Sequence, residues 1–455
     1  MKSELPKVVH EILGKPMVAY PTECAFALGA SPVVAVVGHQ AERVEETLRA
    51  HFPEGLRCAL QAEQKGTGHA VQMALQSLPA DWESDSVLIL YGDTPLLRTE
   101  SLADLVAMQS EAKADLALLT TRLPDPTGYG RIVRDAAGQV TGIVEHKDAS
   151  AAEREIDEVN PGIYVMSSAF LRAGLARLSS DNAQGELYLT DLVAMAATEG
   201  RVVDLPVDAE DTLGVNDRVQ LAEAAGVLQQ RINHDAMRAG VTLLDPKSTF
   251  IEPGVRLGKD VIVGPQVSLR GQSVVGDEVV IEQGAILQDT HVENGARIRA
   301  YSVCEQAHVG PHAEAGPYAR LRPDAVLMEK SKVGNFVEVK KARLGKGAKA
   351  NHLSYLGDAE IGAGSNVGAG TITCNYDGHG KHKTVLGEGV FIGSNSTLVA
   401  PVRIQDGAYV AADSCVTREV PADALAISRT KQENKEGYAA RLRARNAARA
   451  NKKVK

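Results

Sequence analysis

A six-residue repeat in the C-terminal half of this 455-residue chain constrains its fold more than any other feature. Helices do not repeat every six residues, and a plain strand alternates every two. The period therefore predicts a β-solenoid in which each hexad is a short strand plus a turn, and three hexads make a triangular coil. The repeating positions are Ile251, Leu257, Val263, Leu269, Val275, Ile281, Leu287, Ile361, Val367, Thr373, Leu386, Ile392, Leu398, Ile404, Val410 and Val416.

The repeat is interrupted by the segment CNYDGHGKHKTV, residues 374–385. This segment is polar and basic and contains glycine, so it cannot continue the stack of aliphatic side chains. An insertion of this kind must leave a solenoid as a loop, and loops on rigid scaffolds often carry function.

The N-terminal half alternates short aliphatic runs with stretches of helical pattern. This alternation predicts an α/β domain with a largely parallel sheet. The predicted strands are Val33–Val37, Val87–Leu90 and Leu116–Leu119, and the predicted helices are Glu42–Ala50, His69–Leu78 and Ser101–Gln109.

Composition and charge exclude several classes of function. The chain has 49 basic and 58 acidic residues, a net charge of −9, which argues against nucleic-acid binding by the whole protein. No apolar run approaches the roughly 20 residues of a membrane span, so no membrane insertion is expected. Five scattered cysteines without metal-ligand or redox spacing favour a reducing, cytoplasmic location.

Three segments of the N-terminal half are candidates for ligand binding. Gln61–His69 contains a Gly-bearing turn before a helix, where backbone N–H groups can bind a ligand. The same pattern is also typical of a segment that only begins a helix. Asp93 follows a predicted strand at the end where α/β domains bind ligands, but it could cap a turn. Asn216 opens the next helix, where an N-cap is equally natural.

Taken together, the motifs QAEQKGTGHA, YGD, DPTGYGRI, GIVEHKDA, QGELYLTD and GVND precede the solenoid in the expected order. With RLRP, NFVEVKKARLGKG, NHLSYLGDAEIG and GAGTITCNYDG inside it, the chain resembles the bacterial bifunctional N-acetylglucosamine-1-phosphate uridyltransferase/glucosamine-1-phosphate acetyltransferases. The resemblance implies a Rossmann-like α/β nucleotidyltransferase domain followed by a left-handed parallel β-helix. The expected domains are residues 1–216 (uridyltransferase), 217–240 (linker helix) and 241–455 (acetyltransferase with a basic tail).

The resemblance implies two reactions and a homotrimer. One transfers acetyl from acetyl-CoA to glucosamine-1-phosphate. The other joins UTP to N-acetylglucosamine-1-phosphate, giving UDP-N-acetylglucosamine and pyrophosphate. A monomer should be inactive in acetyl transfer, because the family shares that pocket between subunits.

For acetyl transfer, the resemblance places the general base on His352, since an imidazole can accept a proton near neutral pH. Arg322 and Lys340 would hold the sugar phosphate. The remaining sugar and acetyl-CoA contacts implied by the resemblance are Tyr355, Asn366, Ala369, Asn375, Tyr376, Ser394, Ala412 and Arg429. Ser394 and Asn366 also suit solenoid turns.

For uridyl transfer, the resemblance places Mg²⁺ on Asp93 and Asn216, because this ion prefers oxygen ligands and often takes only one or two from protein. Lys7 would meet phosphate. The other implied substrate contacts are Gln61, Gly66 and Thr67 at the uracil, Gly130, Glu145 and Asn160 at the sugar, and Tyr91 and Gly92 beside Asp93.

The beginning of the chain departs from the family pattern, which has a first strand and a Gly-rich phosphate loop ahead of the segment MKSELPK. Two explanations stay open: a start placed about twenty residues too late, which we favour because Lys7, Asp93 and Asn216 remain, or a crippled uridyltransferase. We expect the 455-residue chain to acetylate glucosamine-1-phosphate and to make little UDP-sugar.

After Glu436 the chain has no acidic residue, and its basic tail predicts a solvated helix or one that screens the CoA phosphates, rather than a nucleic-acid or membrane contact. The tail's basic residues are Arg441, Arg443, Arg445, Arg449, Lys452, Lys453 and Lys455. Three alternatives remain: a monofunctional acetyltransferase, a sugar-1-phosphate nucleotidyltransferase with a structural β-helix, and a non-catalytic scaffold.

Overall fold

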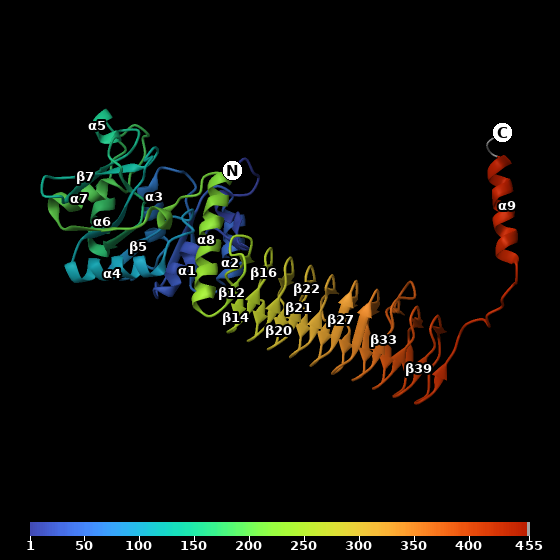
Figure 1. The fold of residues 1–455 in the computed structure, drawn as a ribbon. Coiled ribbons are helices and arrows are strands. Elements are labelled where there is room, and N and C mark those ends of the chain that lie inside the picture. Colours follow the sequence, from blue (N-terminus) through green and yellow to red (C-terminus); the bar gives the residue numbers. More distant parts are fainter. Residues whose placement is uncertain (453–455) are drawn as a thin grey trace. The chain divides into compact units, whose positions relative to one another are not determined.

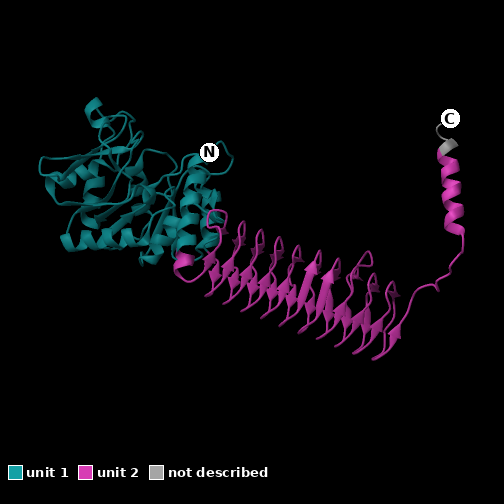
Figure 2. Ribbon diagram, in the orientation of Figure 1, with its two compact units in different colours: residues 1–234, 251–253 teal, residues 235–250, 254–455 magenta. Residues whose placement is uncertain are grey.

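The computed structural model describes residues 1–452 and divides them into two compact units (Figure 2). Unit 1 comprises residues 1–234 and 251–253, and unit 2 comprises residues 235–250 and 254 onward. Lys453 and Lys455 of the basic tail lie outside the described residues. Within residues 1–452, no helix combines the length and the apolar composition that a membrane span requires.

A seven-stranded sheet forms the centre of unit 1, in the order β5-β10-β6-β9-β7-β8 with β11 beside β6. A separate pair, β3 and β4, forms a two-stranded parallel sheet. The strands are β3 (Val33–Val37), β4 (Leu56–Leu60), β5 (Ser86–Ile89), β6 (Leu116–Arg122), β7 (Gly130–Arg134), β8 (Val140–Val144), β9 (Glu158–Asn160), β10 (Tyr164–Ser167) and β11 (Val202–Pro206).

The predicted strands and helices of unit 1 are present, but the expectation of a largely parallel sheet is wrong. In the seven-stranded sheet only β11 and β6 pair in parallel, and the other pairings are antiparallel. β10 runs antiparallel between β5 and β6, and β7, β8 and β9 add further antiparallel pairs on the other side of β6. An aliphatic run reveals burial on both faces and not strand direction, so the sequence could not distinguish the two arrangements.

Helices cover both faces of this sheet (Figure 1). Leu116 and Leu118 of β6 pack with α6 and α7, while Ala117 and Leu119 point to the other face, which α4 covers. The alternation follows from the two-residue period of a strand. The helices of unit 1 are α1 (Ala19–Ala27), α2 (Ala41–His51), α3 (Thr67–Gln76), α4 (Thr99–Ala112), α5 (Ala151–Arg154), α6 (Ser168–Leu175), α7 (Asp191–Glu199) and most of α8 (Arg218–Arg238).

Unit 2 is a parallel β-solenoid with three sheets of eleven, ten and nine short strands (Figure 1). It runs from β12 (Thr242–Leu243) to β41 (Leu425–Ala426), and each strand pairs with the strand one coil later. Val263 lies beside Ile281, and Ile281 beside Ile298. The second of these coils is one residue shorter than the first, which explains why the six-residue phase shifts along the sequence.

Aliphatic side chains fill the interior of the coils, as the repeat predicts. Leu269, Leu287 and Ile392 are completely buried, and Leu257 is the one repeating position that is only half-buried. Between β34 (Ile372–Cys374) and β35 (Thr384–Leu386) the chain leaves the coil as the predicted loop. The basic tail forms α9 (Tyr438–Lys452).

Replacing Leu287 by Ala should lower the free energy of unfolding by about 2–5 kcal/mol, because it opens a cavity in the stacked interior. The measurement is urea denaturation followed by circular dichroism. Leu244→Ala is the control, since that side chain is 63% exposed and its loss should cost within about 0.5 kcal/mol. Equal effects of the two substitutions would contradict the assigned interior.

Candidate functional site

One face of the solenoid gathers four of the predicted acetyltransferase residues on successive coils. Arg322 follows β25 (Arg320–Leu321), Lys340 ends β28 (Glu338–Lys340), Tyr355 begins β31 (Tyr355–Gly357), and Asn375 follows β34. These strands are consecutive neighbours in the ten-stranded sheet. Because these strands stack side by side, the four residues form a continuous column on one surface.

Hydrogen bonds fix the end of this column. The Asn375 amide is buried, donates to Asp358 Oδ2 at 2.5 Å and lies 3.5 Å from the Tyr355 hydroxyl. A side chain at Gly357 would collide with both Tyr355 and Asn375, so this close approach requires glycine.

Three cations converge beside this column. The ammonium of Lys381, from the loop between β34 and β35, and then the guanidinium of Arg322 lower the pKa of Lys340. Arg322 also donates to Glu338 at 2.8 Å. Glu338 pairs with Arg322 and Asp358 acts on Lys340, but three cations gathered in one place are still suited to a phosphate group. Lys381 was not among the predicted residues, although the basic insertion in the repeat was a signal for it.

His352 lies at the end of β30 (Lys349–His352), on the neighbouring sheet and at the corner that leads to Tyr355. Its side chain is exposed, and within residues 1–452 its imidazole has no hydrogen-bond partner. The backbone carbonyl of His352 accepts from Ser354 Oγ at 2.9 Å, which holds the corner. His352 is therefore close in sequence to Tyr355 of the column, and among residues 1–452 its imidazole forms no hydrogen bond with the residues of the column.

The predicted acetyl-CoA residues form a second column. Ala369, Ser394 and Ala412 each stand two residues after a strand of the eleven-stranded sheet: β33 (Asn366–Val367), β36 (Phe391–Ile392) and β39 (Tyr409–Val410). Asn366 begins the first of these strands. Asn395 N–H donates to the Ala369 carbonyl at 2.6 Å and so joins two neighbouring coils along this column.

Two further predicted residues are at the surface. Tyr376 is exposed and its hydroxyl donates to the Gly378 carbonyl at 2.7 Å within the inserted loop. Arg429 is exposed and follows Ser428, whose N–H donates to Ser414 Oγ.

In unit 1, Lys7 joins the two residues predicted to bind metal. Its ammonium is 2.6 Å from Asp93 Oδ2 and 2.9 Å from Asn216 Oδ1. The backbone holds the pair in place, since Val215 N–H donates to the Asp93 carbonyl at 2.9 Å. Two oxygen ligands thus converge on one cation.

The predicted sugar residues also meet. Gly130 and Asn160 are register partners in β7 and β9, and Gly130 lies against Glu145. Asn160 Oδ1 accepts from Gly162 N–H at 3.0 Å, and the Tyr91 ring packs against Gly162 so closely that no Cβ would fit.

Burial raises the pKa of Glu145, which accepts a 3.1 Å hydrogen bond from Thr190 Oγ1. Burial also raises the pKa of the Tyr91 phenol. Gly92, between Tyr91 and Asp93, faces Val18.

The predicted uracil residues surround the start of α3. Gln61 Nε2 donates to the Gly66 carbonyl at 3.1 Å, and Gly66 has φ +99° with the Leu187 backbone where a Cβ would stand. Thr67 Oγ1 accepts from Leu189 N–H at 3.0 Å.

Residues 187–190 connect the uracil and sugar groups, because they contact Thr67 through Leu189 and Glu145 through Thr190. No role was predicted for Thr190. Its only sequence signal was its place in the motif QGELYLTD.

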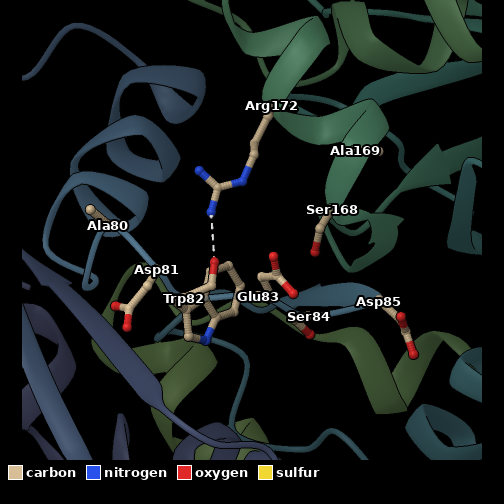
Figure 3. Close-up of a pocket in the computed structure, with 9 residues that line it drawn as sticks. All are labelled: Ala80, Asp81, Trp82, Glu83, Ser84, Asp85, Ser168, Ala169 and Arg172. Carbon is tan, nitrogen blue, oxygen red and sulfur yellow. Dashed lines mark hydrogen bonds between the residues drawn. The ribbon is translucent and has the colours of Figure 1, made fainter.

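A hollow of about 650 Å³ beside Trp82 lies apart from all of these groups (Figure 3). Arg172 of α6 reaches over the Trp82 ring at 5.6 Å and donates to the Trp82 carbonyl at 3.4 Å. None of the predicted site residues lines this hollow, so it is not the candidate site.

Comparison with known proteins gives a consistent result for both units. Residues 2–211 match the family described as nucleotidyl transferase. The chain is 54% identical over 445 residues to the "Bifunctional protein GlmU" of Anaeromyxobacter sp. (strain Fw109-5), covering 98% of this chain and 91% of the relative. It is 51% identical over 450 residues to the protein of the same name from Sorangium cellulosum (strain So ce56), covering 98% of this chain and 94% of the relative. It is 50% identical over 445 residues to the protein of the same name from Pelobacter propionicus (strain DSM 2379 / NBRC 103807 / OttBd1), covering 97% of this chain and 96% of the relative.

The raised pKa of Glu145 predicts a pH-dependent cost to stability. The folded protein binds this proton more tightly than the unfolded chain, so Glu145 should weaken folding as pH rises through the interval above its usual value of 4.5. Relative to Glu145→Gln, the unfolding free energy of the wild type should fall between pH 4.5 and 8, as measured by urea denaturation.

Glu153→Gln is the matched control for this experiment. The Ser150 capping box lowers the pKa of Glu153, so its contribution is lost only below its usual value of 4.5 and should stay flat across the same interval. If the difference in unfolding free energy between the wild type and Glu145→Gln did not change between pH 4.5 and 8, the cost assigned to the burial of Glu145 would be contradicted.

Proposed function

The chain belongs to the family of the bifunctional protein GlmU, and on that premise we propose that His352 and Asp93 serve two separate reactions. The resemblance and the fold class inferred from the motifs are confirmed. The protein is a bifunctional enzyme that transfers acetyl to glucosamine-1-phosphate and uridyl to N-acetylglucosamine-1-phosphate, so the expectation that the chain makes little UDP-sugar is not favoured. The monofunctional, structural-helix and scaffold alternatives are not favoured, since the likeness spans nearly the whole chain.

For acetyl transfer, the cations of Arg322, Lys340 and Lys381 carry the proposal, because they gather on the coils before and after that of His352, where they would form an anion site. They would hold the sugar phosphate while the amine faces the imidazole. Neutral His352 takes a proton from the amine as nitrogen attacks the thioester carbonyl of acetyl-CoA. The C–N bond forms, the C–S bond breaks, and CoA leaves as the thiol after taking up a proton.

The second column suits the cofactor in this scheme. Small residues such as Ala369 and Ala412 leave backbone groups open along the coil edge, where the extended pantetheine chain of acetyl-CoA could lie. Arg429, exposed beyond the column, would meet its phosphates.

For uridyl transfer, a phosphate oxygen of the sugar forms a bond with the α-phosphorus of UTP, and the bond to pyrophosphate breaks. Such a transfer depends on positioning and on neutralising charge. Gly130, Glu145 and Asn160 would hold the sugar, Gln61, Gly66 and Thr67 the base, and Lys7 a phosphate.

Mg²⁺ fits the donor set of this site. Asp93 Oδ2 and Asn216 Oδ1 both lie within 3 Å of the Lys7 ammonium, so two hard oxygens already surround one positive charge. Asp93 and Asn216 would hold the ion, which when bound supplies positive charge to the transferring phosphates.

Crossed substitutions test the division of roles. His352→Ala should lower acetyl transfer by about 10²–10⁴-fold because it removes the base, and should leave uridyl transfer unchanged. Asp93→Asn should lower uridyl transfer and leave acetyl transfer unchanged. Chelation of Mg²⁺ should abolish only uridyl transfer. The measurements are release of CoA thiol and of pyrophosphate. Loss of both reactions in either variant would contradict the division.

A homotrimer is supported by an apolar ridge on the solenoid, formed by Tyr301, Tyr318, Phe336 and Leu353. These side chains stack on successive coils, with ring centroids 5.3 and 5.5 Å apart, and are 40% to 63% exposed. Exposed apolar surface of this kind favours association. Leu353 adjoins His352, so copies packing along the ridge would enclose an imidazole that has no hydrogen-bond partner in the part of the chain that the structure describes.

Replacing Phe336 by Glu should dissociate the assembly, because it places a charge within the ridge. Sedimentation should show monomers, and acetyl transfer should fall at least tenfold while uridyl transfer persists. Phe250→Glu, at an exposed position off the ridge, should change neither quantity. Full acetyl transfer by a proven monomer would contradict the shared pocket.

The domain boundaries at residues 216 and 240 and the cytoplasmic location belong to the same proposal. Leu221 and Leu228 of α8 pack with unit 1, which supports a helix that closes the uridyltransferase half. All five cysteines are free, as a reducing compartment would leave them. Cell fractionation is the test of the location.

A further inference from the structure

The loop between β34 and β35 is folded into a small hairpin. Tyr376 and Lys381 form an antiparallel bridge across it. Beside this bridge, His382 N–H donates to the Asn375 carbonyl at 2.8 Å. Gly378 lies at the tip with a φ of +100°, a conformation that favours glycine. Lys381 therefore stands on the returning limb of the hairpin, opposite Tyr376.

The Asp377 carboxylate is the centre of the hydrogen bonds inside this hairpin. Its Oδ1 accepts from the N–H groups of His379 at 2.8 Å and Gly380 at 2.7 Å. Its Oδ2 lies 2.6 Å from His382 Nε2, an imidazole atom that can donate to a carboxylate. Hydrogen bonds from Gly380 N–H and then from His382 hold the pKa of Asp377 well below its usual value, so the carboxylate stays charged near neutral pH. Asp377 thus joins the tip of the hairpin to the residue that follows Lys381.

Lys381 needs a restraint of this kind because its ammonium faces other cations. The Lys381 ammonium is the first cause of the lowered pKa of Lys340, and Arg322 lowers that pKa further. Like charges repel, so a loop free to move would turn Lys381 away from Lys340 until an anion binds. A loop that is already held in place keeps the cations together, so less of the binding energy of the anion is lost in ordering the loop.

We propose that His382 is a positioning residue for acetyl transfer, and that its hydrogen bond to Asp377 holds the Lys381 ammonium at the sugar-phosphate site. This role rests on the proposed phosphate site and adds to it two residues that would not contact the substrate. Lys383 and Glu360 form an ion pair at the base of the loop. That pair holds the returning limb to the coil, whereas the Asp377–His382 bond closes the hairpin itself.

The test measures the steady-state kinetics of acetyl transfer by the full chain, with glucosamine-1-phosphate varied at saturating acetyl-CoA. His382→Ala should raise the KM for glucosamine-1-phosphate by about three- to tenfold and leave kcat unchanged, because the phosphate contact is made equally in the ground state and the transition state. The KM for acetyl-CoA should stay the same. His382→Gln should bring the KM for glucosamine-1-phosphate back toward the wild-type value, since its amide can donate to Asp377.

His379→Ala is the matched control. His379 is an exposed histidine of the same hairpin, and within residues 1–452 its imidazole forms no hydrogen bond. Alanine keeps the backbone N–H that donates to Asp377, so the KM for glucosamine-1-phosphate should equal that of the wild type. Circular dichroism reports that each variant is folded.

Lys381→Ala separates the positioning role from the proposed phosphate site. This variant should raise the KM for glucosamine-1-phosphate at least as much as His382→Ala does. Adding His382→Ala to it should have no further effect, because the two changes act through the same cation. An unchanged KM in Lys381→Ala would overturn the phosphate site, and the positioning role with it.

Three results would overturn the positioning role while the phosphate site stands. The first is an unchanged KM in His382→Ala when Lys381→Ala raises it. The second is a raised KM in His382→Ala that His382→Gln does not lower. The third is an additive effect of His382→Ala in the Lys381→Ala background, since His382 would then act without Lys381.

Discussion

Parallel stacking of the coils is the constraint on which the acetyltransferase half depends. Each strand pairs with the one a coil later, so an inward aliphatic residue must lie over its counterpart. Outward residues are carried into columns by the same register. Lys340 stands beside Gly357 for this reason, and the absence of a side chain there admits the Tyr355–Asn375 contact. The column of candidate acetyltransferase residues thus follows from the register of the coils. Lys381 joins it from the loop between β34 and β35.

Unit 1 differs from the solenoid, because its candidate site residues come from segments that are far apart in the sequence. Lys7 is far from both Asp93 and Asn216 in the chain, yet its ammonium lies within 3 Å of a side-chain oxygen of each. Residues 187–190 play a similar part by contacting Thr67 on one side and Glu145 on the other. These links depend on helices packed over the two faces of the sheet.

Much of the fold could be predicted from the sequence, since repeats and aliphatic runs are local signals. The interior positions Leu269 and Ile392 follow from periodicity, and the loop between β34 and β35 follows from its interruption. The predicted site residues fall into groups, but their roles come from resemblance to a family. His352 illustrates the limit: the chain offers twelve histidines, and no spacing distinguishes this one.

The sequence by itself determined the solenoid and the order of the two halves, because a hydrophobic period acts through neighbours a fixed distance apart. The tertiary structure alone decided that β10 runs antiparallel and that Thr190 meets Glu145. Strand direction and contacts between distant segments arise when helices and sheet close on one another. That closure depends on the summed packing of the whole unit, and no local pattern encodes it.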